Sequence, residues 1–250
     1  ASSSLKIPAS PPFYKIIVDN HTSPIFHEKV GTSLKDAFLY ASKNYFPPNG
    51  IMPPHEFFSI PQYNTWIELT YDQNQEDILN YARGIVENGM PPGIIMIDDN
   101  WQEDYGKWDF HRGRFPNPKA MMKELKEMGF RVMLWVCPFV SPDSDIYRDL
   151  SERKLFMLDN TDEPAMVRWW NGVSAVLDLT NPESEKWFKG TLDRLIEVYE
   201  VDGFKLDAGD SRFYVGLKSL NDVSPNTQTE LFAKIGLEYP YNEYRATWKM

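Results

Sequence analysis

The chain has 250 residues, of which 42% are hydrophobic and 14% aromatic, and its formal net charge is −10 at pH 7. This length is enough to bury a large core in one big domain or two small ones. An acidic surface repels phosphate backbones and anionic lipids, so we expect neither nucleic acid nor a membrane surface as a partner. The single cysteine, Cys137, allows no internal disulfide, so cysteine usage does not indicate the cellular compartment.

The first 60 residues predict a short β/helix segment. Residues 1–12 are rich in serine and proline and are expected to be irregular, whereas FYKIIVDN (13–20) predicts a strand. The stretch SLKDAFLYASKNY (33–45) predicts a helix with a serine at its cap position. FPPNGIMPP (46–54) predicts a linker or corner, because it carries four prolines and one glycine. We therefore interpret residues 1–60 as the end of an N-terminal domain plus a linker helix.

After residue 60, apolar strands alternate with amphipathic helices. Strands are expected at 61–69, 93–98, 130–137 and 203–207, and helices at 73–89, 117–129, 181–199 and 239–250. Fully apolar strands separated by helices predict an α/β fold with a parallel sheet that is buried on both faces. A (β/α) barrel and a doubly wound sheet both fit this alternation.

The number of strand–helix units indicates a partial barrel. We count four between residues 61 and 250, whereas a complete barrel has eight. We therefore expect residues 61–250 to form the N-terminal half of a catalytic (β/α)8 TIM barrel, with the remainder beyond Met250. Such a half barrel would leave its last strand uncovered, so this chain expressed alone is expected to fold poorly or aggregate.

Polar residues gather where the expected strands end, and chemistry in parallel α/β folds is located at those ends. The clearest case is VDGFKLDAGD (201–210), an apolar strand that carries Lys205 and Asp207. These two residues are two positions apart, so their side chains lie on the same side of the strand. The alternative reading is a buried lysine–aspartate ion pair with a structural role only.

Other common site chemistries find little support in this sequence. It contains no H-E-x-x-H, paired C-x-x-C, G-x-x-x-x-G-K-[ST] or G-x-S-x-G motif. The four histidines, His21, His27, His55 and His111, have no ligand spacing, so we expect no metal site.

Four motifs, in order and with their spacing, resemble glycoside hydrolase family 31. They are IDDNWQ (97–102), RFPNPKAMMKELKEMGFRVMLWVCPFV (114–140), RWWNGVSAVLDLTNPES (168–184) and VDGFKLDAGD (201–210). The resemblance covers about residues 60–250 and implies a retaining α-glycosidase on a (β/α)8 barrel, acting on an oligosaccharide or glycoside without a cofactor. IDDNWQ and a K-x-D strand also occur in related α-galactosidase families, but RFPNPKAM and DLTNP favour family 31.

The resemblance assigns the catalytic nucleophile to Asp207. A retaining glycosidase needs one carboxylate that attacks the anomeric carbon and a second carboxyl group about 5–5.5 Å away that protonates the leaving oxygen. Lys205 would favour the ionised form of Asp207 and could hydrogen-bond a sugar hydroxyl. Gly209 would leave space for the approach of sugar or backbone. Asp98 would hold hydroxyl groups of the same sugar, because a carboxylate can accept two of them.

The remaining expected substrate-binding residues are mostly aromatic. Trp135 and Trp170 match family positions that line the sugar site, where an aromatic face covers the apolar face of a pyranose. Trp101 and Tyr71 are further candidate walls, and each has a plain packing role as its alternative. Asp99 is expected to point away from Asp98, with a loop or helix cap as its alternative. Asp210 matches an acidic family position and would orient the loop or touch the sugar.

The chain departs from the family pattern in two ways. None of its residues matches the family's acid/base aspartate or the arginine that precedes that aspartate. The nucleophile strand reads K-L-D-A-G-D instead of the W-x-D-M-N-E of many α-glucosidases, which favours an α-xylosidase-like or α-galactosidase-like branch. The leading hypothesis is a glycosidase with its acid/base outside this chain. A carbohydrate-binding pseudoenzyme and an unrelated (β/α) enzyme are the alternatives.

Overall fold

The computed structural model describes residues 3–5, 16–18, 28–48 and 50–245, and the chain divides into two units between Gly50 and Ile51. The first unit contains an antiparallel pair of strands, β1 (Ser3–Leu5) and β2 (Ile16–Val18), and one helix, α1 (Leu34–Asn44). Strand β2 lies within the strand predicted at 13–20, whose other residues are outside the described part. Strand β1 was not expected, because its segment was predicted to be irregular.

Helix α1 confirms the helix predicted at 33–45. The Ser33 hydroxyl accepts a hydrogen bond from the Asp36 amide at 3.2 Å, and the Asp36 carboxylate accepts one from the Ser33 amide at 2.9 Å. This reciprocal capping box satisfies two amides that the first turn of a helix cannot pair internally.

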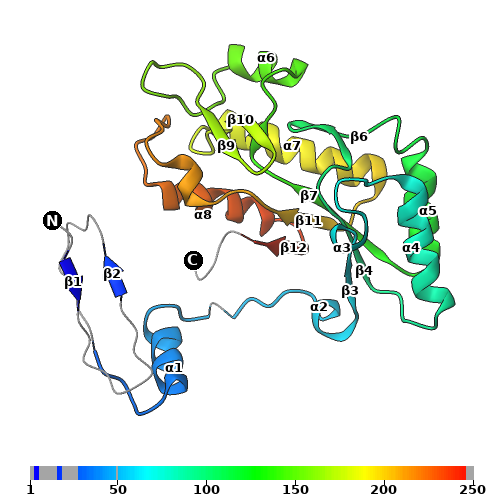
Figure 1. Cartoon of the computed structure of the whole chain (residues 1–250), viewed down its shortest axis with the longest axis horizontal. Helices are drawn as coiled ribbons and strands as arrows, with labels where there is room; N and C mark the ends of the chain where they lie inside the picture. Colours follow the sequence, from blue (N-terminus) through cyan, green and yellow to red (C-terminus); the bar gives the residue numbers. More distant parts are fainter. Residues whose placement is uncertain (1–2, 6–15, 19–27, 49, 246–250) are drawn as a thin grey trace. The chain divides into compact units, whose positions relative to one another are not determined.

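The second unit is an α/β layer built on a parallel sheet (Figure 1). Its elements are α2 (Glu56–Ser59), β3 (Gln62–Asn64), α3 (Trp66–Leu69), α4 (Gln75–Glu87), β4 (Ile94–Ile97), β5 (Gln102–Asp104), β6 (Lys107–Phe110), α5 (Pro118–Glu127), β7 (Arg131–Val136), β8 (Phe139–Val140), α6 (Asp145–Glu152), β9 (Met166–Trp169), β10 (Gly172–Val176), α7 (Pro182–Tyr199), β11 (Gly203–Leu206), the 3-10 helix η1 (Ser211–Tyr214), α8 (Pro225–Gly236) and β12 (Tyr241–Tyr244). The order in the sheet is β12-β11-β7-β4-β3, and all four neighbouring pairs are parallel.

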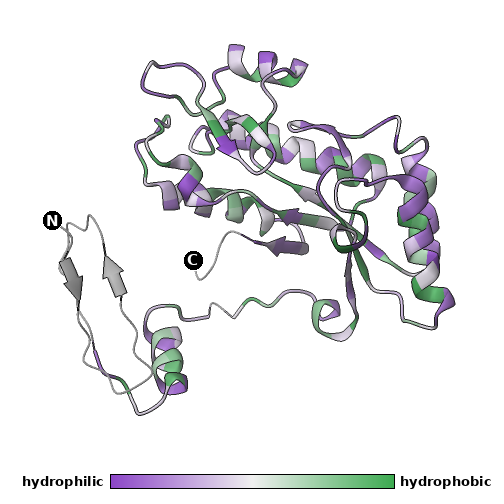
Figure 2. Ribbon diagram, in the orientation of Figure 1, coloured by the Kyte–Doolittle hydropathy of each residue, from purple (hydrophilic) through white to green (hydrophobic). Residues whose placement is uncertain are grey.

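The two-residue period of the strands separates the two faces of the sheet. On β4, Ile95 and Ile97 join the large core that includes the apolar sides of α4, α5, α7 and α8. Ile94 and Met96 belong instead to a small cluster with Met133 of β7. Figure 2 shows the matching pattern on the helices, where hydrophilic and hydrophobic patches alternate along α4 and α5. The side chains that continue the alternation of Ile94 and Met96 beyond the end of β4 therefore lie on the face opposite the large core. The candidate site forms on that face.

Smaller antiparallel elements follow the carboxyl ends of two sheet strands. The hairpin β5–β6 comes after β4, and the three-stranded sheet β8-β10-β9 comes after β7. The alternation of strands and helices did not predict these elements, and it also missed α6 and α8. The strands of the hairpin and of the three-stranded sheet are only two to five residues long, which is too short for a clear periodic pattern.

The end of the described chain corrects one prediction. A helix was expected at 239–250, but Tyr241–Tyr244 form strand β12, and residues 246–250 lie outside the described part. The aromatic residues at 241 and 244 suggest a helical spacing, yet parallel pairing with β11 determines the conformation. The sheet therefore has five strands, and four strand–helix units precede the fifth. The strand expected at 61–69 was also too long, because β3 ends at Asn64 and the helix α3 follows.

None of the helices in the described part of the chain is long and apolar enough to cross a lipid bilayer.

Candidate active site

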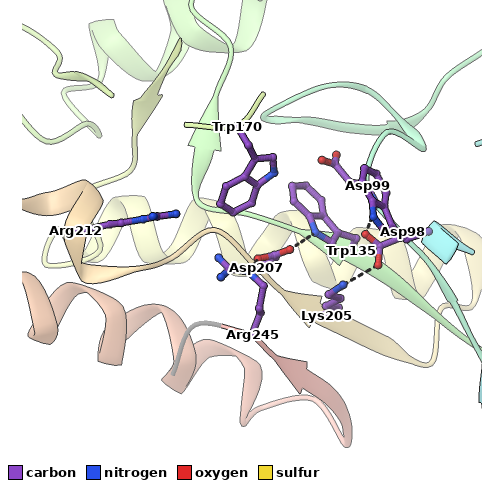
Figure 3. A pocket seen from close by; sticks show the side chains of 9 residues that line it. Asp98, Asp99, Trp135, Trp170, Lys205, Asp207, Arg212 and Arg245 are labelled. Atoms are coloured by element: carbon purple, nitrogen blue, oxygen red, sulfur yellow. Dashed lines mark hydrogen bonds and ion pairs between the residues drawn. The ribbon is translucent and has the colours of Figure 1, made fainter. Parts of the chain in front are cut away.

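A pocket of about 450 Å³ lies at the carboxyl ends of the sheet strands. Figure 3 shows its side chains converging from β4, β7, β11 and the residue that follows β12. The lining residues are Trp66, Asp98, Asp99, Trp135, Trp170, Lys205, Asp207, Arg212 and Arg245. The structure therefore brings together six of the nine residues that the sequence analysis placed in a sugar site.

Asp207 follows β11 and is held by donors on both carboxylate oxygens. Its Oδ2 accepts a hydrogen bond from Trp135 Nε1 at 2.8 Å, and its Oδ1 accepts one from the amide of Ala208 at 2.6 Å. The guanidinium of Arg245 also forms an ion pair with Oδ1. Ala208 has a φ of +60°, an uncommon conformation for a residue with a side chain, and such strain tends to occur at functional sites. These contacts hold the carboxylate in one orientation at the end of the strand.

Lys205 pairs with Asp98 rather than with Asp207. Its ammonium lies 2.7 Å from Asp98 Oδ2, which also accepts a hydrogen bond from the Asn64 side chain at 2.9 Å. The expectation that Lys205 is the cation beside Asp207 is therefore corrected, because Arg245 occupies that position. The structural alternative, a lysine–aspartate pair within this strand, is not met either, because Asp98 follows β4, with β7 between it and β11, and the pair faces the pocket.

Asp99 has its own set of donors. It is only 3% exposed, and Tyr105 donates a hydrogen bond to it at 3.1 Å. The Asn171 side chain donates a second one to Oδ2 at 2.5 Å. Burial raises the pKa of Asp99 to about 6, although hydrogen bonds from Tyr105, the Asn100 amide and Gln102 oppose the increase. Asp99 lines the same pocket as Asp98, but the two carboxylates hydrogen-bond to different sets of side chains.

Trp170 forms an aromatic wall at the tip of the β9–β10 hairpin. Its side chain is 43% exposed, and the guanidinium carbon of Arg245 lies 4.9 Å from the centre of its ring. The neighbouring Trp169 is buried and stacks on Trp135 with ring centres 6.5 Å apart. Trp170, which the sequence analysis placed in the sugar site, therefore lines the pocket, and Trp169 does not.

Three predicted site residues do not line the pocket. Trp101 is fully buried and donates from Nε1 to the carbonyl of Trp135 at 2.8 Å, so it has the packing role that was its alternative. Tyr71 does not line the pocket, and its ring packs edge-to-face with that of Trp66, with 4.9 Å between the ring centres. Asp210 pairs with Arg245 at 2.5 Å, and it therefore acts on the pocket only through that arginine.

Sequence reasoning missed three lining residues, namely Trp66, Arg212 and Arg245. Arg245 follows β12, which was predicted as a helix, so the strand-end argument was not applied to it. Trp66 was placed inside a strand, whereas it begins α3. Arg212 lies in the short helix η1, which follows the loop after β11. Tyrosine is common in strands, so the tyrosine-rich segment before Arg245 could have indicated a strand and placed this arginine at a strand end.

Gly209 has a different role from the expected one. A methyl group at its Cα would lie 2.3 Å from the ring of Phe232 on α8. The absence of a side chain therefore allows the loop after β11 to pack on that helix, and the expected approach of a sugar does not explain it.

Among residues 28–48 and 50–245, no group of three or more histidine, cysteine or acidic side chains is arranged to hold a metal ion.

Comparison with known proteins defines the family. The model of the glycosyl hydrolases family 31 TIM-barrel domain matches residues 51–249, so the chain belongs to this family. It is 39% identical to the myogenesis-regulating glycosidase of Mus musculus over 182 residues, which cover 72% of this chain and 25% of that protein. It is 24% identical to an α-xylosidase of Lactiplantibacillus pentosus, covering 64% of this chain and 21% of that enzyme. The chain thus spans about a quarter of the length of these relatives.

Solved structures support the fold. A family 31 dextranase from Flavobacterium johnsoniae, complexed with glucose, superimposes with a TM-score of 0.70 at 22% identity, covering 87% of this chain and 28% of the dextranase. A family 31 α-xylosidase from a soil metagenome, complexed with xylose, gives 0.65 at 23% identity, covering 75% of this chain and 28% of the enzyme.

Proposed function

We propose that this chain is the first half of the catalytic barrel of a glycosidase that removes terminal α-linked sugars with retention of configuration. The observation that carries the proposal is the environment of Asp207, a carboxylate at a strand end with donors on both oxygens and access to a pocket. Such a group meets the geometric demands on a glycosidase nucleophile, which must be held in place and be accessible to the anomeric carbon. Membership of family 31 and similarity to α-xylosidases and α-glucosidases support the same reaction.

In this mechanism Asp207 attacks the anomeric carbon and the leaving oxygen departs with a proton from a second carboxyl group. A water molecule then hydrolyses the glycosyl ester, and the second group acts as the base. We place that acid/base residue in a part of the full-length protein outside residues 1–250. Asp98 and Lys205 present a carboxylate and an ammonium on the pocket surface, so their free lone pairs and protons can orient sugar hydroxyl groups. Trp170 and Trp135 provide apolar faces for the ring.

The lysine in K-L-D-A-G-D supports an α-xyloside or α-galactoside as substrate rather than an α-glucoside. A panel of aryl α-glycosides assayed with the full-length protein tests this. We expect turnover with at least one of them, and the α-xyloside or α-galactoside to exceed the α-glucoside in kcat/KM by about tenfold or more, since one mispaired hydroxyl group in a polar site has at least that effect. Binding of the free sugars without turnover of any aryl glycoside would instead support the pseudoenzyme alternative.

A further inference from the structure

One amide side chain at the tip of the β9–β10 hairpin contacts three other parts of the fold. Asn171 Nδ2 donates to Asp99 Oδ2 at 2.5 Å and to the hydroxyl of Tyr105 at 2.7 Å. Its Oδ1 accepts a hydrogen bond from the hydroxyl of Tyr71 at 3.0 Å. The amide therefore uses both of its N–H groups and its oxygen, and its three partners follow three different elements, namely β4, β5 and α3.

Asn171 is the neighbour of Trp170, the exposed pocket wall. The tip between β9 and β10 has only two residues, and Gly172 has a φ of +101°, which closes the turn. In so short a turn, the position of Asn171 fixes the position of Trp170. Trp170 in turn lies against Arg245, which pairs with Asp207. A chain of direct contacts thus links the attachment of the hairpin to the carboxylate that we propose as the nucleophile.

We propose that Asn171 is a positioning residue that clamps the hairpin to Asp99 and so holds Trp170 in place as the wall of the sugar pocket. The inference rests on the proposed function for its consequences in catalysis, but the clamp itself is a property of the hairpin. It also explains two observations that the mechanism leaves unused, namely the polar cluster around buried Asp99 and the contact of Tyr71, which lies outside the pocket.

The clamp depends on the charge of Asp99. The charged or titratable groups around that carboxylate are Asp98 on its own strand end, Tyr105 after β5, and Cys137 after β7. The Tyr105 hydroxyl and the Cys137 thiol both have a raised pKa because they are buried, so they stay neutral at neutral pH. Since burial raises the pKa of Asp99 to about 6, its carboxylate is mostly ionised at pH 7.5 and mostly protonated at pH 5. The bond from Asn171 is charge-assisted only at the higher pH.

The variant Asn171→Asp tests the clamp with a side chain of the same shape. At pH 7.5 it sets a second carboxylate against Asp99, and the two repel each other. At pH 5 the pair can share one proton, which restores a hydrogen bond. We therefore expect KM of the full-length variant to exceed that of the wild type about tenfold at pH 7.5, with a smaller change in kcat. The ratio should fall towards one at pH 5. A ratio that does not depend on pH would overturn the proposal.

Hydrogen exchange of residues 166–176 gives a readout that does not need turnover. Relative to the wild type at the same pH, Asn171→Asp should exchange faster in this hairpin at pH 7.5 and nearly equally at pH 5. Asn88→Asp is the matched control, because the Asn88 side chain donates to the carbonyl of Gly84 at the end of α4 and lines no part of the pocket. Equal exchange in variant and wild type at pH 7.5 would exclude the clamp. If the wild type hydrolyses no glycoside, the proposed function fails while this measurement still decides the clamp.

Discussion

Replacing Asp207 by asparagine in the full-length enzyme is expected to lower kcat by roughly 10⁴-fold or more. The amide keeps the shape of the carboxylate, and its oxygen can still accept from Trp135 or Ala208, but it cannot form the glycosyl ester. Binding of the free sugar should therefore change much less than turnover. The measurement is kcat on an aryl glycoside with a good leaving group, together with the dissociation constant of the sugar product.

The control for Asp207→Asn is Asp162→Asn. Asp162 is an exposed aspartate that pairs with Lys218 outside the pocket, so its loss should leave both kcat and sugar binding unchanged. Thermal melting of both variants establishes that they are folded. Turnover of Asp207→Asn close to that of the wild type would show that this residue is not the nucleophile.

The second large effect is expected for Lys205→Met. This change removes the ammonium from Asp98, which is 3% exposed and keeps the Asn64 side chain and the Asp99 amide as donors. Removing one partner of a buried ion pair leaves an uncompensated charge, so the free energy of unfolding should fall by about 3 kcal/mol. KM should rise by about tenfold to a hundredfold, since the ammonium also reaches the pocket. Chemical denaturation and steady-state kinetics of the full-length protein measure the two effects.

Lys218→Met provides a matched comparison. Lys218 and Asp162 are also 2.7 Å apart, but their side chains are 48% and 74% exposed. Exposed pairs contribute little to stability, so this variant should unfold like the wild type. The opposite outcome for Lys205→Met would support the sequence-based interpretation that Lys205 acts on Asp207. If Lys205→Met kept full stability and only moved the acidic limb of kcat/KM to higher pH, the lysine would act on Asp207 and not on Asp98.

The sequence predicted the parallel sheet and the strand ends of the site because both depend on local patterns. Apolar runs of four to eight residues followed by an acidic residue located β4 and β11, and the two-residue period placed Lys205 and Asp207 on one side. The same patterns could not decide which charges pair across strands. Pairing depends on sheet order, and β7 lies between β4 and β11. The sequence therefore could not predict the ion-pair partners of Asp98 and Asp207.

The wrong helix at 239–250 shows a second limit. The tyrosines of β12 fit either a helix or a strand, and the decisive contribution is the parallel pairing with β11, which is not visible in a local window. Arg245 was missed as a consequence. Likewise, Asn171 lies within one of the four family motifs, but the sequence did not predict its hydrogen bonds. Its partners Asp99 and Tyr71 are 72 and 100 positions away along the chain. Such contacts are created by tertiary structure and leave no periodic signal.

The most direct test of the central claim is to locate a trapped glycosyl-enzyme. A 2-deoxy-2-fluoro glycoside of the best sugar from the aryl panel slows both chemical steps, because fluorine destabilises the oxocarbenium-like transition state. With a good leaving group the ester forms and persists, and peptide mass spectrometry then identifies the labelled residue. We predict one fluoro-sugar per chain, attached to Asp207. A label on Asp98, Asp99 or Asp210 instead would contradict the assignment of the nucleophile to the end of β11.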